Sequence, residues 1–194
     1  VDHGIRGETS ERDSLFVKKL CERFSVPLYY EKVDCPKFSE ENGLSPEEGA
    51  RTLRYRVFSR AIESGFCDKI ATAHHASDRV ETVLFNLFRG TSPLGAGGIA
   101  ETGRDGKIIR PMLSLSREEI DRYADENKLE YVTDETNFET DYTRNFLRLN
   151  VIPLIKQKFP EVEKSVLRFA DTVSTDDEYL TELAENAILC ENEE

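Results

Sequence analysis

The most regular apolar pattern lies in residues 45–65, SPEEGARTLRYRVFSRAIESG. Its apolar residues recur three or four positions apart, as on one face of an α-helix: Ala50, Leu53, Val57, Ala61 and Ile62. Ser45 is a typical N-cap residue, Pro46 suits the first helical position, and Glu48 completes a capping box. Gly65 is a typical stop signal. The segment is therefore predicted to be an amphipathic helix.

Strand and helix patterns alternate over residues 1–90. KIATA (69–73) does not alternate between apolar and polar residues, as expected of a strand covered on both faces. A second strand is predicted for LYYEKV (28–33), and helices are predicted from Ser10 onward and from Ser77 to Arg89. The remaining predictions are a strand end at Val1–Asp2, a loop over 34–44 and a helix stop at Gly90. This alternation favours a parallel sheet.

The pattern changes after residue 90. Residues 90–106 hold six of the eleven glycines, which indicates a flexible loop or one that approaches a ligand. IIRPML (108–113) is predicted to be extended, and Ser116 opens a capped helix. Further helical segments follow from Asp141, and the apolar spacing from Pro160 predicts a long or broken helix, with a polar interruption at Ser174–Asp177.

The predicted fold class is α/β. Residues 1–113 form an open parallel sheet flanked by helices, and residues 114–194 form a mainly helical C-terminal subdomain. A chain of 194 residues is long enough for one domain with an appendage.

The net charge of −12 is unevenly distributed. Nine of the 38 Asp and Glu residues follow Arg168 and no Lys or Arg does, so residues 1–169 carry only −3. Basic residues form two clusters: Arg51, Arg54, Arg56 and Arg60, then Arg144 and Arg148. These clusters are either solvated helix faces or local surfaces for a polyanion. The acidity of the chain therefore does not exclude a nucleic-acid partner.

Two features bear on the compartment. No stretch approaches the roughly 18 apolar residues that span a bilayer, and the start, VDHGIRGETSERD, is polar, unlike a signal peptide. The four cysteines contain no CxxC pair, which argues against a zinc ribbon and fits a reducing cytoplasm. We expect a cytoplasmic protein with no membrane partner. Val1 is not a methionine, so the chain is taken to be a fragment.

Residues 71–90, ATAHHASDRVETVLFNLFRG, concentrate polar chemistry at the end of a predicted strand, where open α/β sheets bind ligands. Asp78 and Glu81 are three positions apart in the first helical turn and lie off its apolar stripe. They are a carboxylate pair for Mg²⁺ or an ammonium ligand, or simply acids that stabilise a helix start. His74 and His75 lack the i, i+4 spacing of zinc proteases, which disfavours zinc.

Five segments, in order along nearly the whole chain, resemble bacterial tRNA(Ile)-lysidine synthetase, a family of N-type ATP pyrophosphatases. They are VDHGIRG (1–7), ARTLRYRVF (50–58), residues 71–90, IIRPML (108–113), and the run from Asp134 through YTRNFLR (142–148) to Pro153. The resemblance implies an adenine nucleotide alpha hydrolase-like fold. It also implies ATP and Mg²⁺ as cofactors, with free L-lysine and a CAU-anticodon tRNA(Ile) as substrates. A homodimer is left open.

The reaction implied by the resemblance converts the wobble cytidine to lysidine. ATP adenylates O2 of the cytidine, and the ε-amine of lysine then displaces AMP. Asp78 and Glu81 would hold the lysine ammonium or Mg²⁺. Free lysine titrates near pH 10.4, so one carboxylate is expected to accept a proton as the amine attacks.

The resemblance also implies two groups of binding residues. The ATP-binding residues would be Asp2, His3, Gly4, Arg51 and His74. The lysine- or tRNA-binding residues would be Arg110, Tyr142, Arg144, Asn145 and Arg148. Several of these residues have a purely structural alternative: a strand-to-loop turn for Asp2 to Gly4, a solvated helix position for Arg51, a structural histidine for His74, and buried packing for Tyr142.

Two departures from the family pattern matter. The phosphate-binding SGGxDS loop is absent from the sequence and would precede Val1, so the chain alone is expected to be inactive. Ser77 and Arg79 replace an acid and an amide that the family often carries. Two alternatives stay open: a PP-loop tRNA thiolation enzyme, and a catalytically incompetent fragment that binds nucleotide or tRNA.

Overall fold

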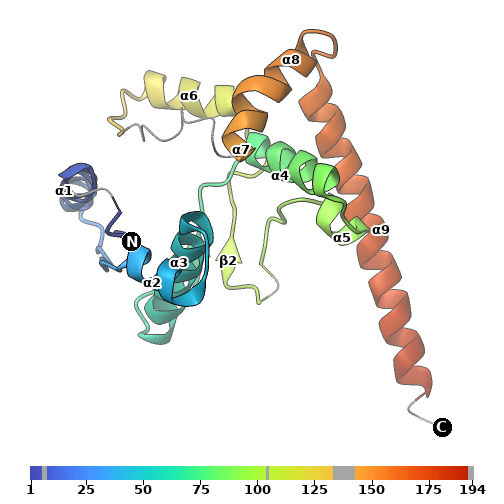
Figure 1. The fold of residues 1–194 in the computed structure, drawn as a ribbon, viewed down its shortest axis with the longest axis horizontal. Helices are drawn as coiled ribbons and strands as arrows, with labels where there is room; N and C mark the ends of the chain where they lie inside the picture. The colour runs from blue at the N-terminus through green and yellow to red at the C-terminus, as the bar shows by residue number, and fades with distance from the viewer. Residues whose placement is uncertain (6–7, 104, 133–142, 192–194) are drawn as a thin grey trace. The chain divides into compact units, whose positions relative to one another are not determined.

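The computed structural model describes residues 1–5, 8–103, 105–132 and 143–191. The chain divides into two compact units, Val1–Ile70 and Ala71–Glu194. The helices of the first unit are α1 (Glu8–Arg23), α2 (Cys35–Asn42) and α3 (Pro46–Glu63) (Figure 1). The second unit contains α4 (Ala76–Arg89), α5 (Pro93–Ala96), β2 (Ile108–Ile109), α6 (Arg117–Glu126), α7 (Thr143–Phe146), the π-helical turn η2 (Leu147–Val151), α8 (Ile152–Lys156) and α9 (Val162–Glu191). The strand β1 (Ile70–Ala71) lies at the boundary.

The core of the first unit forms where α2 packs on α3. The predicted capping box of α3 is confirmed, because Ser45 N and Glu48 N each donate to the other residue's side chain, at 3.0 and 3.3 Å. Leu53, Val57 and Ala61 on its apolar face are buried. Residue 49 is a glycine because a Cβ there would collide with Ser39 of α2. The two helices therefore approach each other closely at this point.

Three predictions for the first unit were wrong. The loop predicted over 34–44 contains α2, whose first turn is capped by Asp34 Oδ1, an acceptor for Lys37 N at 3.0 Å. The helix predicted from Ser10 begins at Glu8, so Ser10 lies within its first turn. The strand predicted over 28–33 is reduced to a parallel bridge between Asp2 and Lys32. Its described pairing is limited to the stretch at Asp2, where Asp2 N donates to Glu31 O at 2.9 Å and Val33 N donates to Asp2 O at 2.8 Å.

The second unit is organised around α4 and α9. The strands β1 and β2 pair in a small two-stranded sheet, next to which Thr72 N donates to Ile109 O at 3.0 Å. The helix α4 contacts α5, α7, η2 and α9. Its Val80 and Val83 are 1% and 0% exposed, and Ala170 of α9 is fully buried. A single apolar layer between these helices therefore supports the start of α4.

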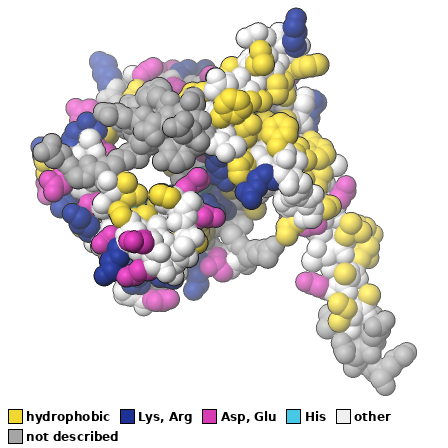
Figure 2. Space-filling view, viewed as in Figure 1, with side chains coloured by type: hydrophobic (Ala, Val, Ile, Leu, Met, Phe, Trp, Pro, Cys, Tyr) yellow, Lys and Arg dark blue, Asp and Glu magenta, His cyan; other side chains and the backbone are white. Residues whose placement is uncertain are grey.

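The last helix is continuous, which decides between the long and the broken helix left open by the sequence. A Cβ on Gly97 would collide with Ser174, which belongs to the predicted polar interruption. The small residues at these two positions allow the segment after α5 to approach α9. The C-terminal part of α9 extends beyond α5 (Figure 1). Apolar side chains gather over α8 and again along α9 (Figure 2). None of the described helices is long and apolar enough to cross a membrane.

Candidate active site

The first turn of α4 fixes the position of the predicted carboxylate pair. His75 precedes the helix with extended backbone, and its N donates to Asp78 Oδ2 at 2.9 Å. The buried residues Val80 and Val83 set the rotation of the helix about its axis. Asp78 and Glu81 consequently lie together on a neighbouring face, as the sequence predicted from their spacing.

Arg148 of η2 binds this carboxylate pair. Its Nε donates to Glu81 Oε1 at 2.6 Å and its Nη2 donates to Glu81 Oε2 at 2.9 Å. The same Nη2 lies 3.5 Å from Asp78 Oδ1. The side chain of Glu81 is only 4% exposed, against 22% for Asp78 and 39% for Arg148. Glu81 is therefore held by a bidentate, largely buried ion pair, whereas Asp78 is more open.

The ion pair favours the charged form of Arg148. Hydrogen bonding to Glu81 raises the pKa of Arg148, and this effect exceeds the opposing effect of burial. One guanidinium therefore partly neutralises two carboxylates. The cluster keeps a net negative charge, which suits an incoming cation such as an ammonium group.

The donor set does not fit a magnesium ion bound by both carboxylates. Both oxygens of Glu81 accept hydrogen bonds from Arg148, and no group of three His, Cys, Asp or Glu residues in the described parts of the chain is arranged to hold a metal. Mg²⁺ prefers six oxygen ligands in an octahedral arrangement. Asp78 alone would contribute one of them.

The two histidines of this stretch differ in their contacts. His74 Nδ1 lies 2.8 Å from Thr72 Oγ1, within hydrogen-bond distance. His75 Nε2 lies 3.6 Å from Asp78 Oδ2, and its Nδ1 is buried with no hydrogen-bond partner among the described residues. His75 thus supports Asp78 from the N-terminal end of α4.

The other residues predicted to bind lysine or tRNA are only partly gathered here. Arg144 of α7 lies over the Phe85 ring of α4, with its guanidinium carbon 5.5 Å from the ring centroid. Arg110 donates through Nη1 to Ala100 O at 2.7 Å, so it supports the glycine-rich segment. Asn145, also in α7, is half-buried. Tyr142 lies outside the described residues.

Three of the predicted ATP-binding residues, Asp2, His3 and Gly4, form a tight turn in the first unit. Asp2 is 6% exposed, and its carboxylate accepts hydrogen bonds from Gly4 N and Tyr30 OH, both at 3.0 Å. The hydrogen bond from Gly4 N is the main reason that the pKa of Asp2 is lowered. Gly4 has φ +66°, and a Cβ on it would lie 2.9 Å from Val33 O. Asp2 therefore holds the backbone of the turn.

His3 and Arg51 have contrasting environments. Burial, and secondarily the charge of Arg54, lowers the pKa of His3, whose Nδ1 has no partner among the described residues. Arg51 is exposed on α3, with its guanidinium carbon 5.1 Å from the centroid of the Tyr55 ring. A neutral imidazole and an exposed guanidinium are both suited to contact a nucleotide.

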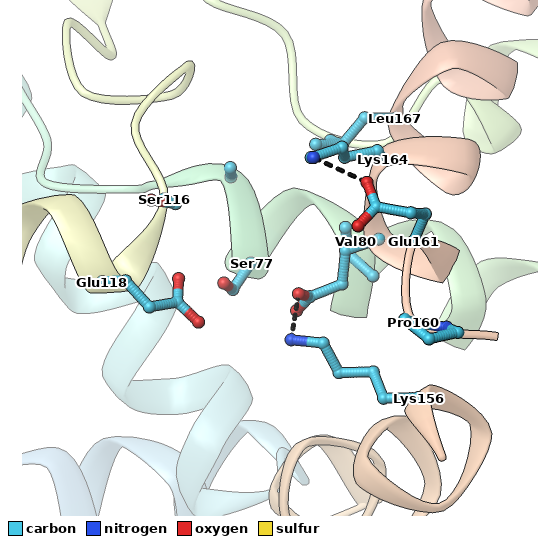
Figure 3. Close-up of a pocket in the computed structure, with 11 residues that line it drawn as sticks. Ser77, Val80, Ser116, Glu118, Lys156, Pro160, Glu161, Lys164 and Leu167 are labelled. Atoms are coloured by element: carbon cyan, nitrogen blue, oxygen red, sulfur yellow. Dashed lines mark ion pairs between the residues drawn. The ribbon is translucent and has the colours of Figure 1, made fainter. Parts of the chain in front are cut away.

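A separate pocket of about 300 Å³ lies on another face of α4 (Figure 3). Ser77 and Val80 line it, together with Ser116 at the start of α6. Its two lysines are already paired, Lys156 with Glu163 and Lys164 with Glu161. Ser77, which replaces an acid in the family pattern, thus faces a pocket that is lined by other acids.

Comparison with known proteins identifies the family. The model of the PP-loop domain matches residues 1–155. The chain belongs to the PP-loop domain family. This match covers both Asp78 and Glu81 of α4 and Arg148 of η2.

Among curated relatives, the chain is similar to proteins named tRNA(Ile)-lysidine synthase. It is 45% identical to the one from Thermosipho africanus over 89% of this chain, and 38% identical to the one from Clostridium acetobutylicum over 96% of this chain. It is 37% identical to the one from Bacillus subtilis, also over 96% of this chain. The chain spans about 40% of the length of each of these relatives. These likenesses confirm the family resemblance seen in the sequence.

A solved structure supports the fold. The PP-loop chain is similar to a U34-tRNA thiolase, NcsA from Methanococcus maripaludis, with a TM-score of 0.67 and 18% identity. The likeness covers 89% of this chain and 59% of that one. The predicted class of a helix-flanked α/β fold is thereby confirmed.

Two features of the site were not predicted. The sequence assigned Arg148 to lysine or tRNA, but its guanidinium pairs with Glu81, 67 positions away. The contacts of Arg89 and of Arg144 with the Phe85 ring were also missed. The i, i+4 spacings of Arg144 and Arg148 and of Phe85 and Arg89 are the only sequence signals that pointed to these contacts.

Proposed function

We propose that this PP-loop domain belongs to an enzyme that converts the wobble cytidine of a CAU-anticodon tRNA(Ile) to lysidine, with ATP and free L-lysine. The observation that carries the proposal is the 37–45% identity to proteins named tRNA(Ile)-lysidine synthase over 89–96% of the chain. The cluster of Asp78, Glu81 and Arg148 supports it, because a net negative site suits a lysine ammonium group.

The proposed reaction has two steps. O2 of the cytidine attacks the α-phosphorus of ATP, and pyrophosphate leaves. The lysine ε-amine then forms a bond to C2, the bond between C2 and O2 breaks, and AMP leaves with that oxygen. The amine must lose a proton before or during its attack. The protein therefore has to bind an ammonium group and also remove its proton.

Asp78 is the better candidate for proton acceptance. Both oxygens of Glu81 are engaged by Arg148, whereas Asp78 is more exposed and meets Arg148 only at 3.5 Å. Free lysine titrates near pH 10.4, about three units above neutrality, so the base must offset roughly 4 kcal/mol. We assign proton acceptance to Asp78. Glu81 acts as a positioning residue that fixes Arg148, whose remaining N–H groups are available to the lysine carboxylate.

The other assignments complete the proposal. The turn held by Asp2 presents His3 and Gly4 to the nucleotide, and Arg51 and His74 contribute to the same function. Arg110, Tyr142, Arg144 and Asn145 bind lysine or tRNA. Mg²⁺ enters with the phosphates of ATP.

The test uses the complete gene product with ATP, Mg²⁺, radiolabelled lysine and CAU-anticodon tRNA(Ile). Label that survives mild base, which removes aminoacyl esters, is scored beside pyrophosphate release. Asp78→Ala is expected to lower label formation at least about 100-fold while pyrophosphate release persists, because base catalysis contributes about 10²–10⁴-fold. Glu118→Ala, which removes an exposed acid of α6, is the matched control.

Two outcomes would contradict the proposal. Pyrophosphate release without label by the unsubstituted protein would rule out lysine as the nucleophile, and a sulfur donor would be tried next. Equal label formation by the Asp78→Ala and Glu118→Ala variants would rule out the assignment of Asp78.

A further inference from the structure

Two arginines from different helices meet at one aromatic ring in the second unit. The guanidinium carbon of Arg89 lies 5.1 Å from the centroid of the Phe85 ring, and that of Arg144 lies 5.5 Å from it. The two guanidinium carbons are therefore within about 11 Å of each other. Phe85 and Arg89 are one turn apart on α4, whereas Arg144 belongs to α7. The helix contact between α4 and α7 thus brings two like charges together.

Neither arginine has a carboxylate partner within the described parts of the chain. Arg79 pairs with Asp171, Arg117 with Asp121, and Arg148 with Glu81. No comparable ion pair involves Arg89 or Arg144 among the described residues, although the chain as a whole is acidic. Among the described residues, therefore, no carboxylate neutralises the positive charge at Phe85.

The geometry suits an oxyanion with several oxygens. Arg89 is exposed and Arg144 is half-buried. The Phe85 ring restricts the motion of both side chains, because a cation is attracted to the face of an aromatic ring. A planar guanidinium donates two parallel hydrogen bonds to a phosphate, and two such groups can share one phosphate or bind neighbouring ones.

The cluster of Arg89, Phe85 and Arg144, here called the Phe85 arginine pair, is near the proposed reaction centre. Glu81 and Phe85 are one turn apart on α4, and Arg144 and Arg148 are similarly spaced across α7 and η2. A polynucleotide whose reacting base lies at Asp78 carries a backbone phosphate on each side of that nucleotide. The Phe85 arginine pair is therefore suitably placed to bind one of them.

We propose that the Phe85 arginine pair binds a backbone phosphate of the RNA substrate. The inference rests on the proposed function, because it takes an RNA as the substrate. It adds Arg89 and Phe85 to the site and gives Arg144 a defined ligand. The other sources of an oxyanion are the phosphates of ATP and the carboxylate of lysine, and the test separates them.

The experiment measures tRNA affinity against salt concentration for the complete gene product, without ATP or lysine. Arg89→Gln and Arg144→Gln are each expected to weaken binding about 5- to 10-fold at low salt. Each is also expected to reduce the slope of log affinity against log salt by about 0.7–0.9, which corresponds to one lost phosphate contact. Arg144→Lys should retain most of the slope, because it keeps the charge.

The matched control is Arg122→Gln on α6, which removes another exposed arginine from the same unit. It is expected to change affinity less than twofold. Circular dichroism of each variant tests whether the fold is retained, and Phe85→Leu should weaken tRNA binding without changing the slope.

Two kinds of result would overturn the inference, and a third would reject only the proposed reaction. Both glutamine variants could match Arg122→Gln in affinity and slope. Alternatively, tRNA binding by the variants could be unchanged, while in the lysine-labelling assay their KM rises for ATP alone or for lysine alone. Such a result would assign the pair to that ligand. If the glutamine variants lose slope but the unsubstituted protein incorporates no lysine, the proposed reaction is rejected and the phosphate site is retained.

Discussion

A carboxylate as buried as that of Glu81 requires a fixed cation, because little water can reach it. Its side chain is 4% exposed and accepts two hydrogen bonds from Arg148. Both residues were predicted from the sequence to belong to the site. Their ion pair was not predicted, since 67 positions separate them along the chain. The proximity of Asp78 and Glu81 was predictable from spacing alone, because residues three positions apart lie on the same face of a helix, here α4.

Removal of the cation should destabilise the fold. Arg148→Met is expected to lower the free energy of unfolding by about 2 kcal/mol, because it leaves the Glu81 carboxylate buried without its partner. This expected loss is smaller than that for a fully buried ion pair, because the Arg148 side chain is 39% exposed. Urea denaturation of Arg148→Met, Glu81→Gln and the double variant measures the coupling energy. Additive effects of the two substitutions would contradict the prediction.

His3 should make stability depend on pH. Burial lowers the pKa of His3 in the folded state below its ordinary value of about 6.5. The unfolded chain therefore binds a proton that the folded chain resists, so stability falls as pH drops through 6.5 towards the folded pKa. His3→Gln should flatten this part of the profile, measured as the urea midpoint between pH 8 and 5. An unchanged profile in the variant would show that other groups cause the dependence.

At the scale of elements, capping chemistry was the most reliable signal. The boxes at Ser45 and Ser116 were predicted and are present in α3 and α6. The helix α2 was missed because it has eight residues and lacks an apolar repeat. The strand predicted over 28–33 was overestimated, because strand formation depends on a neighbouring segment that local sequence does not reveal.

Arg79 connects α4 to the elements beside it. Its Nη1 pairs with Asp171 of α9 at 2.6 Å, and its Nε donates to Gly97 O at 3.2 Å. Arg79→Ala should lower the free energy of unfolding by about 1–2 kcal/mol, because the buried end of this link loses a charged donor. Asp171→Ala should cost less than about 1 kcal/mol, because Asp171 is 64% exposed. Thermal or urea unfolding measures both, and equal losses would contradict the assigned role.

At the scale of the whole molecule, negative charge is concentrated in the C-terminal part of α9, where the side chains are exposed. Residues 178–188 of α9 are all exposed, whereas Ala170 of the same helix is fully buried. No Lys or Arg follows Arg168, so the carboxylates of this segment lack basic neighbours on their own helix. The helix is continuous because its packed N-terminal half nucleates the exposed half.

Hydrogen exchange should divide α9 into two parts. Backbone amides of residues 178–188 are expected to exchange at least about tenfold faster than those of residues 163–174, a difference of about 1.4 kcal/mol in opening free energy. The measurement is made on the 194-residue chain, with amides of α4 as the protected reference. Uniform protection along α9 would contradict the prediction.

The sequence by itself determined the helices α3, α4 and α6, the capped starts of α3 and α6, and the shared face of Asp78 and Glu81. These features depend on residues within one or two turns of each other, so local spacing is enough to specify them. Only the tertiary structure decided that Arg148 neutralises Glu81 and that Arg89 and Arg144 meet at Phe85. Those contacts join segments far apart in the chain, and their geometry follows from how α4 packs against α7, η2 and α9. Packing of this kind depends on the shapes of all the buried side chains together, which no single stretch of sequence contains.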